Sequence, residues 1–256
     1  MSFHLYLDTR ESDGTSNYNT YWYLNNPRFV LMRDFDVCLR SIEFPNTVYP
    51  TNEYNNVVVF TPDSIEALSV ALEPGSYTGD VYAATIAAGM QQVLQQYDTP
   101  AYAAAVVTGS YDSLSKKITL VCSVPIKFVL ASNSAYEQMG FDESSFNTTA
   151  TDWTSTYPVN LSGTAYVDVV TNLTVPSYNM RNSGHLLCRI QVDESFGNVI
   201  FYKNESTDMV QCTSRHIDRV EIKLFDDHGN PFKLPDNAHM SLVLTLQNGL
   251  DDFNEK

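Results

Sequence analysis

Short runs of β-branched and aromatic residues, each closed by Gly, Pro, Asn or Asp, recur along almost all of this 256-residue chain. Runs of this kind are typical of β-strands bounded by turns. The candidate strands are FHLYLD, NTYWYL, DVCLRSIEF, NVVVFT, YAAAVVTGSYD, KKITLVCS, KFVLA, AYVDVVT, LLCRIQVD, NVIFYKN, VEIKLFDD and MSLVLTLQ. One sheet rarely holds so many strands, so the pattern predicts an all-β protein built from two packed sheets.

Two segments have a helical pattern instead. In residues 78–97, apolar positions recur every three or four residues, which places one apolar stripe on a helix. These positions are Tyr82, Ile86, Met90, Val93 and Tyr97. Thr78 or Ser76 is suited to cap the start of this helix. A second, short helix is predicted near residues 133–140, ending at Gly140 in a left-handed cap.

The segment VEIKLFDDHGNPFKL predicts a hairpin whose turn covers residues 226–231. Its first strand alternates apolar residues with Glu221 and Lys223, as expected for one buried face and one solvated face. The turn places two carboxylates beside His228, and this arrangement has two interpretations. They bind a cation, or they bond to the backbone of their own turn, and the second interpretation is favoured because Asp and Asn commonly do so.

The charge of the chain constrains its partners. There are 30 acidic and 15 basic residues, which gives a formal net charge of −15. Such a surface repels phosphate backbones, so we predict no direct binding of nucleic acid. We find no apolar run long enough for a membrane-spanning helix and no secretion signal at the start, and we therefore expect a soluble, unprocessed chain.

Cysteines and histidines give no sign of a catalytic or metal centre. The four cysteines form no CxxC pair, so buried free thiols in a reducing compartment are favoured over disulfides. The five histidines lack metal-ligand spacing, and no P-loop, GxSxG or GxGxxG motif occurs. We therefore predict no enzyme activity, no catalytic residue, no cofactor and no metal.

Two aromatic groups are candidate contact residues. The first lies on an early aromatic strand and consists of Tyr18, Tyr21, Trp22 and Tyr23, which are candidates for contacts between subunits. The second lies in residues 142–164, a Ser-, Thr- and Asn-rich segment interpreted as a long surface loop. Its Trp153 and Tyr157 are candidates for exposed loop contacts.

Five segments follow one another along the chain: YLDTRESDGTSNYNTYWYLNNP, FDVCLRSIEFPNTVYPTNEYNNVVVF, LEPGSYTGDVYAATIAAGMQQVL, SAYEQMGF and IDRVEIKLFDDHGNPFKL. In this order they resemble the penton or minor capsid proteins of virophages and polinton-like viruses. The resemblance covers residues 7–246 and rests on the order of short motifs.

The resemblance implies a jelly-roll β-sandwich that occupies the five-fold vertices of an icosahedral virion. It implies a homopentamer whose partner is a double-jelly-roll major capsid protein, located in the virion and made in the host cytoplasm or nucleus. Residues 28–256 would form a single jelly-roll domain. Residues 1–27 would be either an arm that reaches a neighbour or an edge strand of the same domain. The resemblance transfers no active site.

The segment EFPNTVYPTNEYNNVVVF, residues 43–60, fits this fold as a stiff crossing between two sheets. Pro45 and Pro50 each fix a backbone angle, and the asparagines satisfy turn backbone groups. The main alternative to a capsid protein is a lectin-like carbohydrate-binding sandwich, since aromatic loops suit sugar stacking. An enzyme on the same scaffold is a third hypothesis, and it lacks a catalytic constellation.

Overall fold

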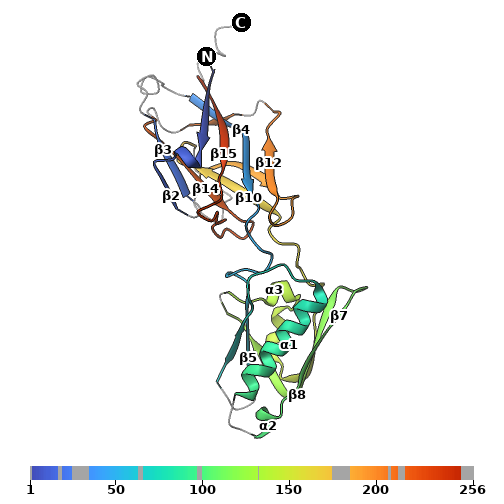
Figure 1. Cartoon of the computed structure of the whole chain (residues 1–256). Coiled ribbons are helices and arrows are strands. Elements are labelled where there is room, and N and C mark those ends of the chain that lie inside the picture. Colours follow the sequence, from blue (N-terminus) through green and yellow to red (C-terminus); the bar gives the residue numbers. More distant parts are fainter. Residues whose placement is uncertain are drawn as a thin grey trace. The chain divides into compact units, whose positions relative to one another are not determined.

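The computed structural model describes residues 2–16, 19–24, 35–62, 66–96, 100–131, 133–174, 185–206, 209–212 and 217–248. The chain forms two compact units (Figure 1). Residues 1–48 and 164–256 form the first, which we call the sandwich unit, and residues 49–163 form the second, the inserted unit. The resemblance found in the sequence implied one jelly-roll domain over residues 28–256. The structure differs because the strands of the inserted unit pair with one another and enclose a core of their own.

Two five-stranded antiparallel sheets make up the described part of the sandwich unit. Sheet A contains β1 (Ser2–Asp8), β15 (Ser241–Asn248), β4 (Phe35–Pro45), β12 (Val199–Lys203) and the short β13 (Val210–Gln211). Sheet B contains β11 (Leu186–Gln191), β10 (Tyr166–Thr171), β14 (Arg219–Phe225), β3 (Asn19–Tyr23) and the short β2 (Gly14–Ser16). A 3-10 turn, η1 (Thr9–Glu11), follows β1.

The strand order identifies the sandwich unit as a jelly roll. Apart from the short β2 and β13, sheet A has the order β1-β15-β4-β12 and sheet B the order β11-β10-β14-β3. When these eight strands are counted along the chain, the first, eighth, third and sixth form sheet A. The second, seventh, fourth and fifth lie in the other, which is the arrangement of two interlocked Greek keys. The predicted all-β jelly-roll fold is confirmed in this unit.

Alternation along the strands builds the core of the sandwich unit. In β14 the even-numbered Val220, Ile222 and Leu224 are buried, and the odd-numbered residues face outward. The strand β15 has the same pattern, and its leucines at even positions are buried. Phe44 and Phe232 meet edge to face with ring centroids 5.6 Å apart. Burial of each such side chain stabilises the fold by roughly 1.5–3 kcal/mol.

The predicted hairpin after β14 is only half formed. The turn closes through a bond from the Asp226 N–H to the Asn230 carbonyl, 2.8 Å, and Phe225 forms an isolated bridge with Pro231. No regular strand follows among residues 231–240, and the chain next enters β15. The Pro231 ring provides no N–H for a ladder at this position.

The segment after β4 leads from the sandwich unit into the inserted unit, not from one sheet of the sandwich to the other. Its asparagines satisfy backbone groups as predicted. Asn46 Nδ2 donates to the Glu194 carbonyl, 2.7 Å, and Asn55 Nδ2 donates to the Pro50 carbonyl, 2.9 Å. The Asn52 N–H donates to Asn55 Oδ1, 2.7 Å. The crossing is thus fixed locally by its own side chains.

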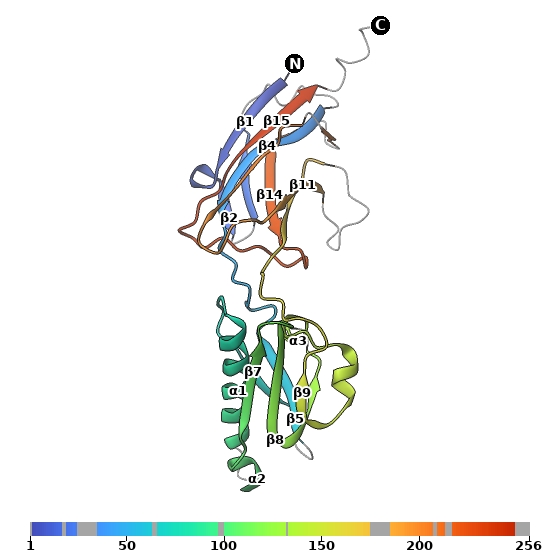
Figure 2. The same ribbon diagram turned by 90° about the vertical axis from the view of Figure 1, so that its right-hand side faces the viewer.

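The inserted unit is a mixed α and β structure. Its sheet has the order β6-β5-β8-β7, with β9 paired to β8. The strands are β5 (Val57–Pro62), β6 (Leu68–Ala71), β7 (Val107–Asp112), β8 (Lys117–Val129) and β9 (Ala150–Thr154). The helices are α1 (Gly79–Gln95), α2 (Pro100–Ala103), α3 (Tyr136–Met139) and the 3-10 helix η3 (Glu143–Asn147). Helix α1 lies along the sheet (Figure 2).

Helix α1 confirms the predicted helix over residues 78–97. Thr78 caps its start, because its side chain accepts a hydrogen bond from the Val81 N–H. Of the predicted apolar stripe, Tyr82, Ile86 and Met90 are buried and Val93 is half-buried, while Tyr97 lies outside the described residues. Leu94, which was not predicted, is buried in place of Val93. A Cβ on Gly109 of β7 would lie 2.2 Å from the Ala83 carbonyl oxygen, so only glycine permits this close approach of helix and strand.

Two glutamines of α1 bind the sheet. Gln91 Oε1 accepts a hydrogen bond from the Val107 N–H, 3.0 Å, and Gln95 Nε2 donates to the Ala105 carbonyl, 3.0 Å. Their amides thus bond to main-chain groups at the start of β7 and just before it. No helix among the described residues is long and apolar enough to span a membrane.

The second predicted helix is confirmed as α3, which ends at a left-handed glycine. Gly140 has φ 76°, its N–H donates to the Glu137 carbonyl, and the Phe141 N–H donates to the Tyr136 carbonyl. This pair of bonds is a Schellman motif. Phe141 then stacks on Phe128, with ring centroids 5.2 Å apart, so the cap also directs an aromatic ring into the core.

Candidate assembly surfaces

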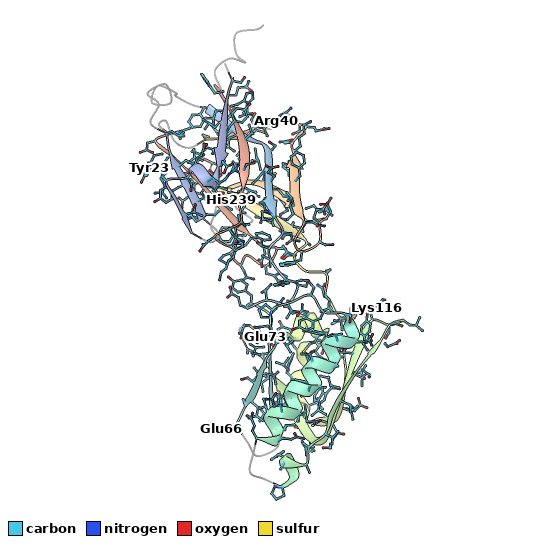
Figure 3. All side chains as sticks on the ribbon, in the orientation of Figure 1. Tyr23, Arg40, Glu66, Glu73, Lys116 and His239 are labelled. Carbon is cyan, nitrogen blue, oxygen red and sulfur yellow. The ribbon has the colours of Figure 1, made fainter. Side chains whose placement is uncertain are left out.

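The residues predicted on the early aromatic strand occupy different environments. Trp22 is only 5% exposed, and its Nε1 donates to the Asp8 carbonyl, 2.9 Å, so it is a core residue and not a contact residue. The ring of Tyr21 lies 4.6 Å from the Arg219 guanidinium. Tyr23 is half exposed and points away from the strands (Figure 3). Tyr18 lies outside the described residues.

Trp153 and Tyr157 also differ. Trp153 lies on β9, is 6% exposed and meets Phe128 edge to face at 5.1 Å, so its prediction as an exposed loop contact is wrong. Tyr157 is 59% exposed, while its N–H donates to the Gly140 carbonyl. The predicted surface loop over residues 142–164 therefore contains η3 and a paired strand. The first group of candidates belongs to the sandwich unit and the second to the inserted unit.

The outer face of sheet B satisfies its own charges. Arg189 binds Asp168 through two bonds, of 2.7 and 3.0 Å, and its guanidinium lies 3.7 Å from the centre of the Tyr166 ring. The hydrogen bond to Asp168 raises the pKa of Arg189. Glu221 pairs with Arg219 at 3.1 Å and with Lys223 at 3.3 Å. Both carboxylates are thus paired with cations, and this face is polar.

The pKa of Glu221 reflects the same pairing. Burial alone would raise it, but a hydrogen bond from Asn19 and the two neighbouring cations outweigh burial and lower it. The carboxylate is therefore held in its charged form within this face.

The outer face of sheet A is different, because it exposes apolar side chains. Tyr6 on β1 is 76% exposed, and Phe201 and Val199 on β12 are 63% and 55% exposed. In the register of the sheet, Tyr6 lies in one row with Val243, Ser41 and Lys203. Phe201 lies in the next row with Glu43, Ser241 and Asp8. Single exposed apolar residues are common on protein surfaces, but these lie on the two edge strands of sheet A, beside which a further strand could pack.

The two edges of sheet A carry main-chain groups that no described strand satisfies. The even-numbered residues along β12 direct their main-chain N–H and C=O groups toward β4. Two hydrogen bonds show this direction: the Asn46 N–H donates to the Asn198 carbonyl, and the Asn204 N–H donates to the Arg40 carbonyl. Val199, Phe201 and Lys203 therefore direct their main chains away from β4. On β1 the odd-numbered residues direct their main-chain groups toward β15, as the hydrogen bond from the Thr9 N–H to the Met240 carbonyl shows. The even-numbered ones, including His4 and Tyr6, face the free edge.

Sheet B protects its edges. The edge strand β2 has only 3 residues. The other edge strand, β11, has a register irregularity where it pairs with β10 and carries the Arg189 charge outward. Short strands, irregularities and charges are the usual devices that prevent edge-to-edge pairing. Sheet A lacks these devices at the middle of both its edges.

A charged pair closes the end of β1. Asp8 accepts hydrogen bonds from the Arg10 N–H, 2.8 Å, and from Arg10 Nε, 2.9 Å. The hydrogen bond from the Arg10 side chain lowers the pKa of Asp8 from 3.8 to about 2. This pair holds the Asp8 carbonyl that accepts the Trp22 indole, so it links the edge strand to the core.

We expect the Asp8 pair to stabilise the sandwich unit in a pH-dependent way. Its pKa is lower in the folded state than in the unfolded state, so the contribution is complete above pH 3.8 and is lost as the pH falls toward about 2. Acid unfolding of Asp8→Asn and the unchanged chain should therefore differ above this window and converge below it. A difference that stays constant across the whole range would contradict the assignment.

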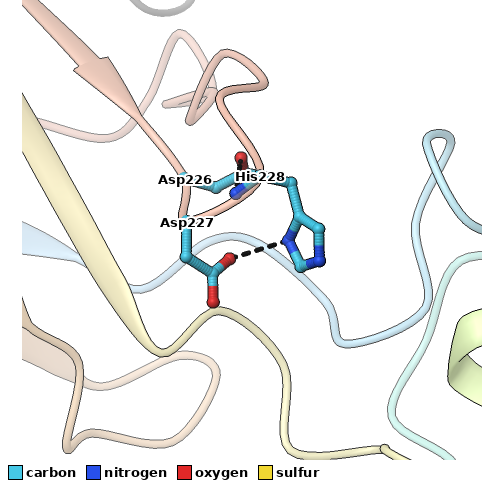
Figure 4. A group of neighbouring side chains, drawn as sticks. All are labelled: Asp226, Asp227 and His228. Carbon is cyan, nitrogen blue, oxygen red and sulfur yellow. Dashed lines mark hydrogen bonds and ion pairs between the residues drawn. The ribbon is translucent and has the colours of Figure 1, made fainter. Parts of the chain in front are cut away.

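The turn after β14 brings Asp226, Asp227 and His228 together (Figure 4), with one potential ligand atom from each within 4.8 Å of the others. Asp226 Oδ1 accepts bonds from the His228 and Asn230 N–H groups, 2.9 and 2.7 Å. Asp227 Oδ2 accepts the Ala165 N–H, 2.9 Å, and its Oδ1 contacts His228 Nδ1. The carboxylates thus bond to the turn and its neighbours, as the favoured interpretation of the sequence expected.

The described cysteines are free thiols, as predicted: Cys38, Cys122, Cys188 and Cys212. Burial raises the pKa of Cys212 to about 12 and also raises the pKa values of Cys122 and Cys188. A thiol is nucleophilic only as the thiolate, so these groups are held in an unreactive form.

Comparison with known protein families finds no match for this chain. Curated proteins give no match either. Among solved structures, the chain is similar to the crystal structure of the mavirus penton protein, with 12% identity, a TM-score of 0.48, and coverage of 96% of this chain and 99% of the other. It is also similar to a chain in the cryo-EM structure of the Sputnik virophage, with 13% identity, a TM-score of 0.41, and coverage of 96% and 98%.

Proposed function

We propose that this chain is a structural subunit of an icosahedral virion. In this proposal it is the penton, which forms a homopentamer at each five-fold vertex and contacts a double-jelly-roll major capsid protein. Its activity is assembly, and its site is the set of surfaces that meet neighbouring subunits. Its location is the virion.

The jelly-roll strand order is the observation that carries this proposal. Jelly rolls form viral capsid proteins, and they also occur in lectins and cupins, so the fold alone leaves several functions open. The sequence motifs over residues 7–246, which resemble virophage pentons in their order, favour the capsid among these. The exposed apolar residues and open edges of sheet A fit the same role, since they offer contact surface.

A carbohydrate-binding module is less well supported. That hypothesis relied on Trp153 and Tyr157 as stacking residues in an exposed loop. Trp153 is buried, so the pair does not form an open platform for a sugar ring. No other observation on the described residues favours carbohydrate over a protein partner.

The proposal is tested by the native mass of the purified protein together with its presence in purified particles of the source virus. We expect five-fold rings in electron micrographs, or incorporation into particles at five copies per vertex. Absence from purified particles would overturn the proposal. A monomer in solution that is nevertheless present in particles would agree with it, because rings of vertex proteins can close on a shell.

A further inference from the structure

Among the described strands, none pairs with the outer side of β1 or of β12, and these two edges of sheet A are complementary to each other. Its strands alternate in direction, because β1, β15, β4 and β12 pair in antiparallel fashion throughout. The first and last strands of such a four-stranded path run in opposite directions. If β12 of one copy lies beside β1 of the next, the two strands are antiparallel and the sheet continues without a change of sense.

The side chains at the two edges agree with this pairing. The residues of β12 with free main-chain groups, Val199 and Phe201, present their side chains on the outer face. The residues of β1 with free main-chain groups, His4 and Tyr6, also present theirs on the outer face. A ladder between the edges would therefore form main-chain bonds and place Phe201 against Tyr6 or His4 on one face.

We propose that copies of this chain join head to tail by pairing β12 of one copy with β1 of the next. This inference rests on the proposed function and names the partner of its assembly surface. A head-to-tail contact uses both edges of every copy, so a closed ring leaves neither exposed. A two-fold contact of β12 with β12, or of β1 with β1, would leave one open edge on each copy.

Single cysteines on the two edges test the pairing. Residues opposite each other in a hydrogen-bonded antiparallel pair have Cα atoms about 5.5 Å apart, within the range of a disulfide. The variants are Phe201→Cys, Tyr6→Cys and, for the neighbouring register, His4→Cys. Each changes an exposed side chain, and thermal unfolding checks that the fold is retained. Leu114→Cys is the matched control, because Leu114 is 92% exposed and belongs to the inserted unit, not to sheet A.

We expect a mixture of Phe201→Cys with Tyr6→Cys or His4→Cys to give a disulfide dimer that contains one copy of each. Each variant alone should stay monomeric on a denaturing gel, like the Leu114→Cys control and the unchanged chain. The double variant that combines Phe201→Cys with the productive β1 cysteine should give covalent oligomers up to the ring.

Three results would overturn the inference. They are a dimer from Phe201→Cys alone, a dimer from a β1 variant alone, and no mixed dimer at the highest soluble concentration. The outcomes for the proposed function are separate. Rings or particle incorporation without the mixed dimer would disprove the edge pairing and leave the function standing. A mixed dimer from a protein that is absent from particles would support the edge pairing and disprove the proposed function.

Discussion

Replacement of Trp153 by alanine is expected to destabilise the inserted unit by about 3–5 kcal/mol, the cost of removing a large buried aromatic side chain. Trp153 is 6% exposed and packs edge to face on Phe128, which also stacks on Phe141. Its loss would leave a cavity beside both phenylalanines. Denaturant unfolding measures the loss of stability. Hydrogen exchange of the β8 amides shows whether that loss lies within the inserted unit.

Tyr157→Ala is the matched control for this prediction. Tyr157 lies close in sequence but is 59% exposed, and the substitution keeps the main-chain bond to Gly140. The expected change is within about 0.5 kcal/mol, as for ordinary surface substitutions. Equal effects of the two substitutions would show that Trp153 is not part of the core. The same pair of variants tests the carbohydrate hypothesis in a glycan-binding screen.

Gln138→Leu is expected to lower the free energy of unfolding by about 2–5 kcal/mol. The substitution removes the oxygen that accepts hydrogen bonds from two buried hydroxyls, and it removes the amide that donates to a main-chain carbonyl. Gln138 Oε1 accepts bonds from Tyr82 Oη, 3.0 Å, and Thr51 Oγ1, 3.1 Å. Its Nε2 donates to the Pro50 carbonyl, 3.0 Å. Tyr82 and Thr51 are fully buried, so water cannot replace the lost partner without opening the core. Chemical denaturation monitored at β8 measures the loss.

The matched control is Gln92→Leu, since Gln92 is exposed on α1 and should change stability little. A second variant separates lost bonds from altered shape. Adding Tyr82→Phe and Thr51→Val to Gln138→Leu removes the unsatisfied hydroxyls and should recover part of the loss. If the triple variant is less stable than Gln138→Leu by the sum of the added changes, the three groups do not act as one network.

Most strands could be predicted from the sequence, because alternation and turn residues are local signals. The strand β14 shows this well, since its apolar residues at even positions are the ones buried. The strand β8 was predicted as two separate runs, because Pro125 stands between them. In the structure the strand is continuous, and its pairing with β9 shifts register between Val121 and Ile126, which accommodates the proline.

The strand β9 was missed because most of its residues are polar. Of its five residues only Trp153 is buried, and its neighbours point outward, where Thr154 and Thr119 exchange a hydrogen bond of 2.9 Å. A single aromatic residue between threonines and aspartate is also typical of a loop. The alternation was present in the sequence, but it was too short to separate an edge strand from an exposed loop.

The division into two units could not be read from the sequence. Both units consist of similar strands, and no Gly- or Ser-rich linker separates them. The asparagines of the crossing at residues 43–60 bond to main-chain groups as predicted, yet the predicted destination of the crossing was wrong. Stiffness is a property of Pro45, Pro50 and nearby asparagines, whereas the destination depends on which strands β5 pairs with.

The sequence by itself determined where most strands and the two predicted helices form, because these depend on backbone angles and on the spacing of neighbouring side chains. It offered Thr78 or Ser76 as a helix cap, of which the structure has Thr78, and it identified Gly140 as a helix end, which is confirmed. Only the tertiary structure decided that Trp22 and Trp153 are buried while Tyr6 and Phe201 are exposed. The physical reason is that every strand shares the same two-residue period, so its pattern cannot specify its partner. Pairing joins residues far apart in the chain, such as β1 with β15, and it leaves β1 and β12 at the edges of sheet A with no described strand beside them.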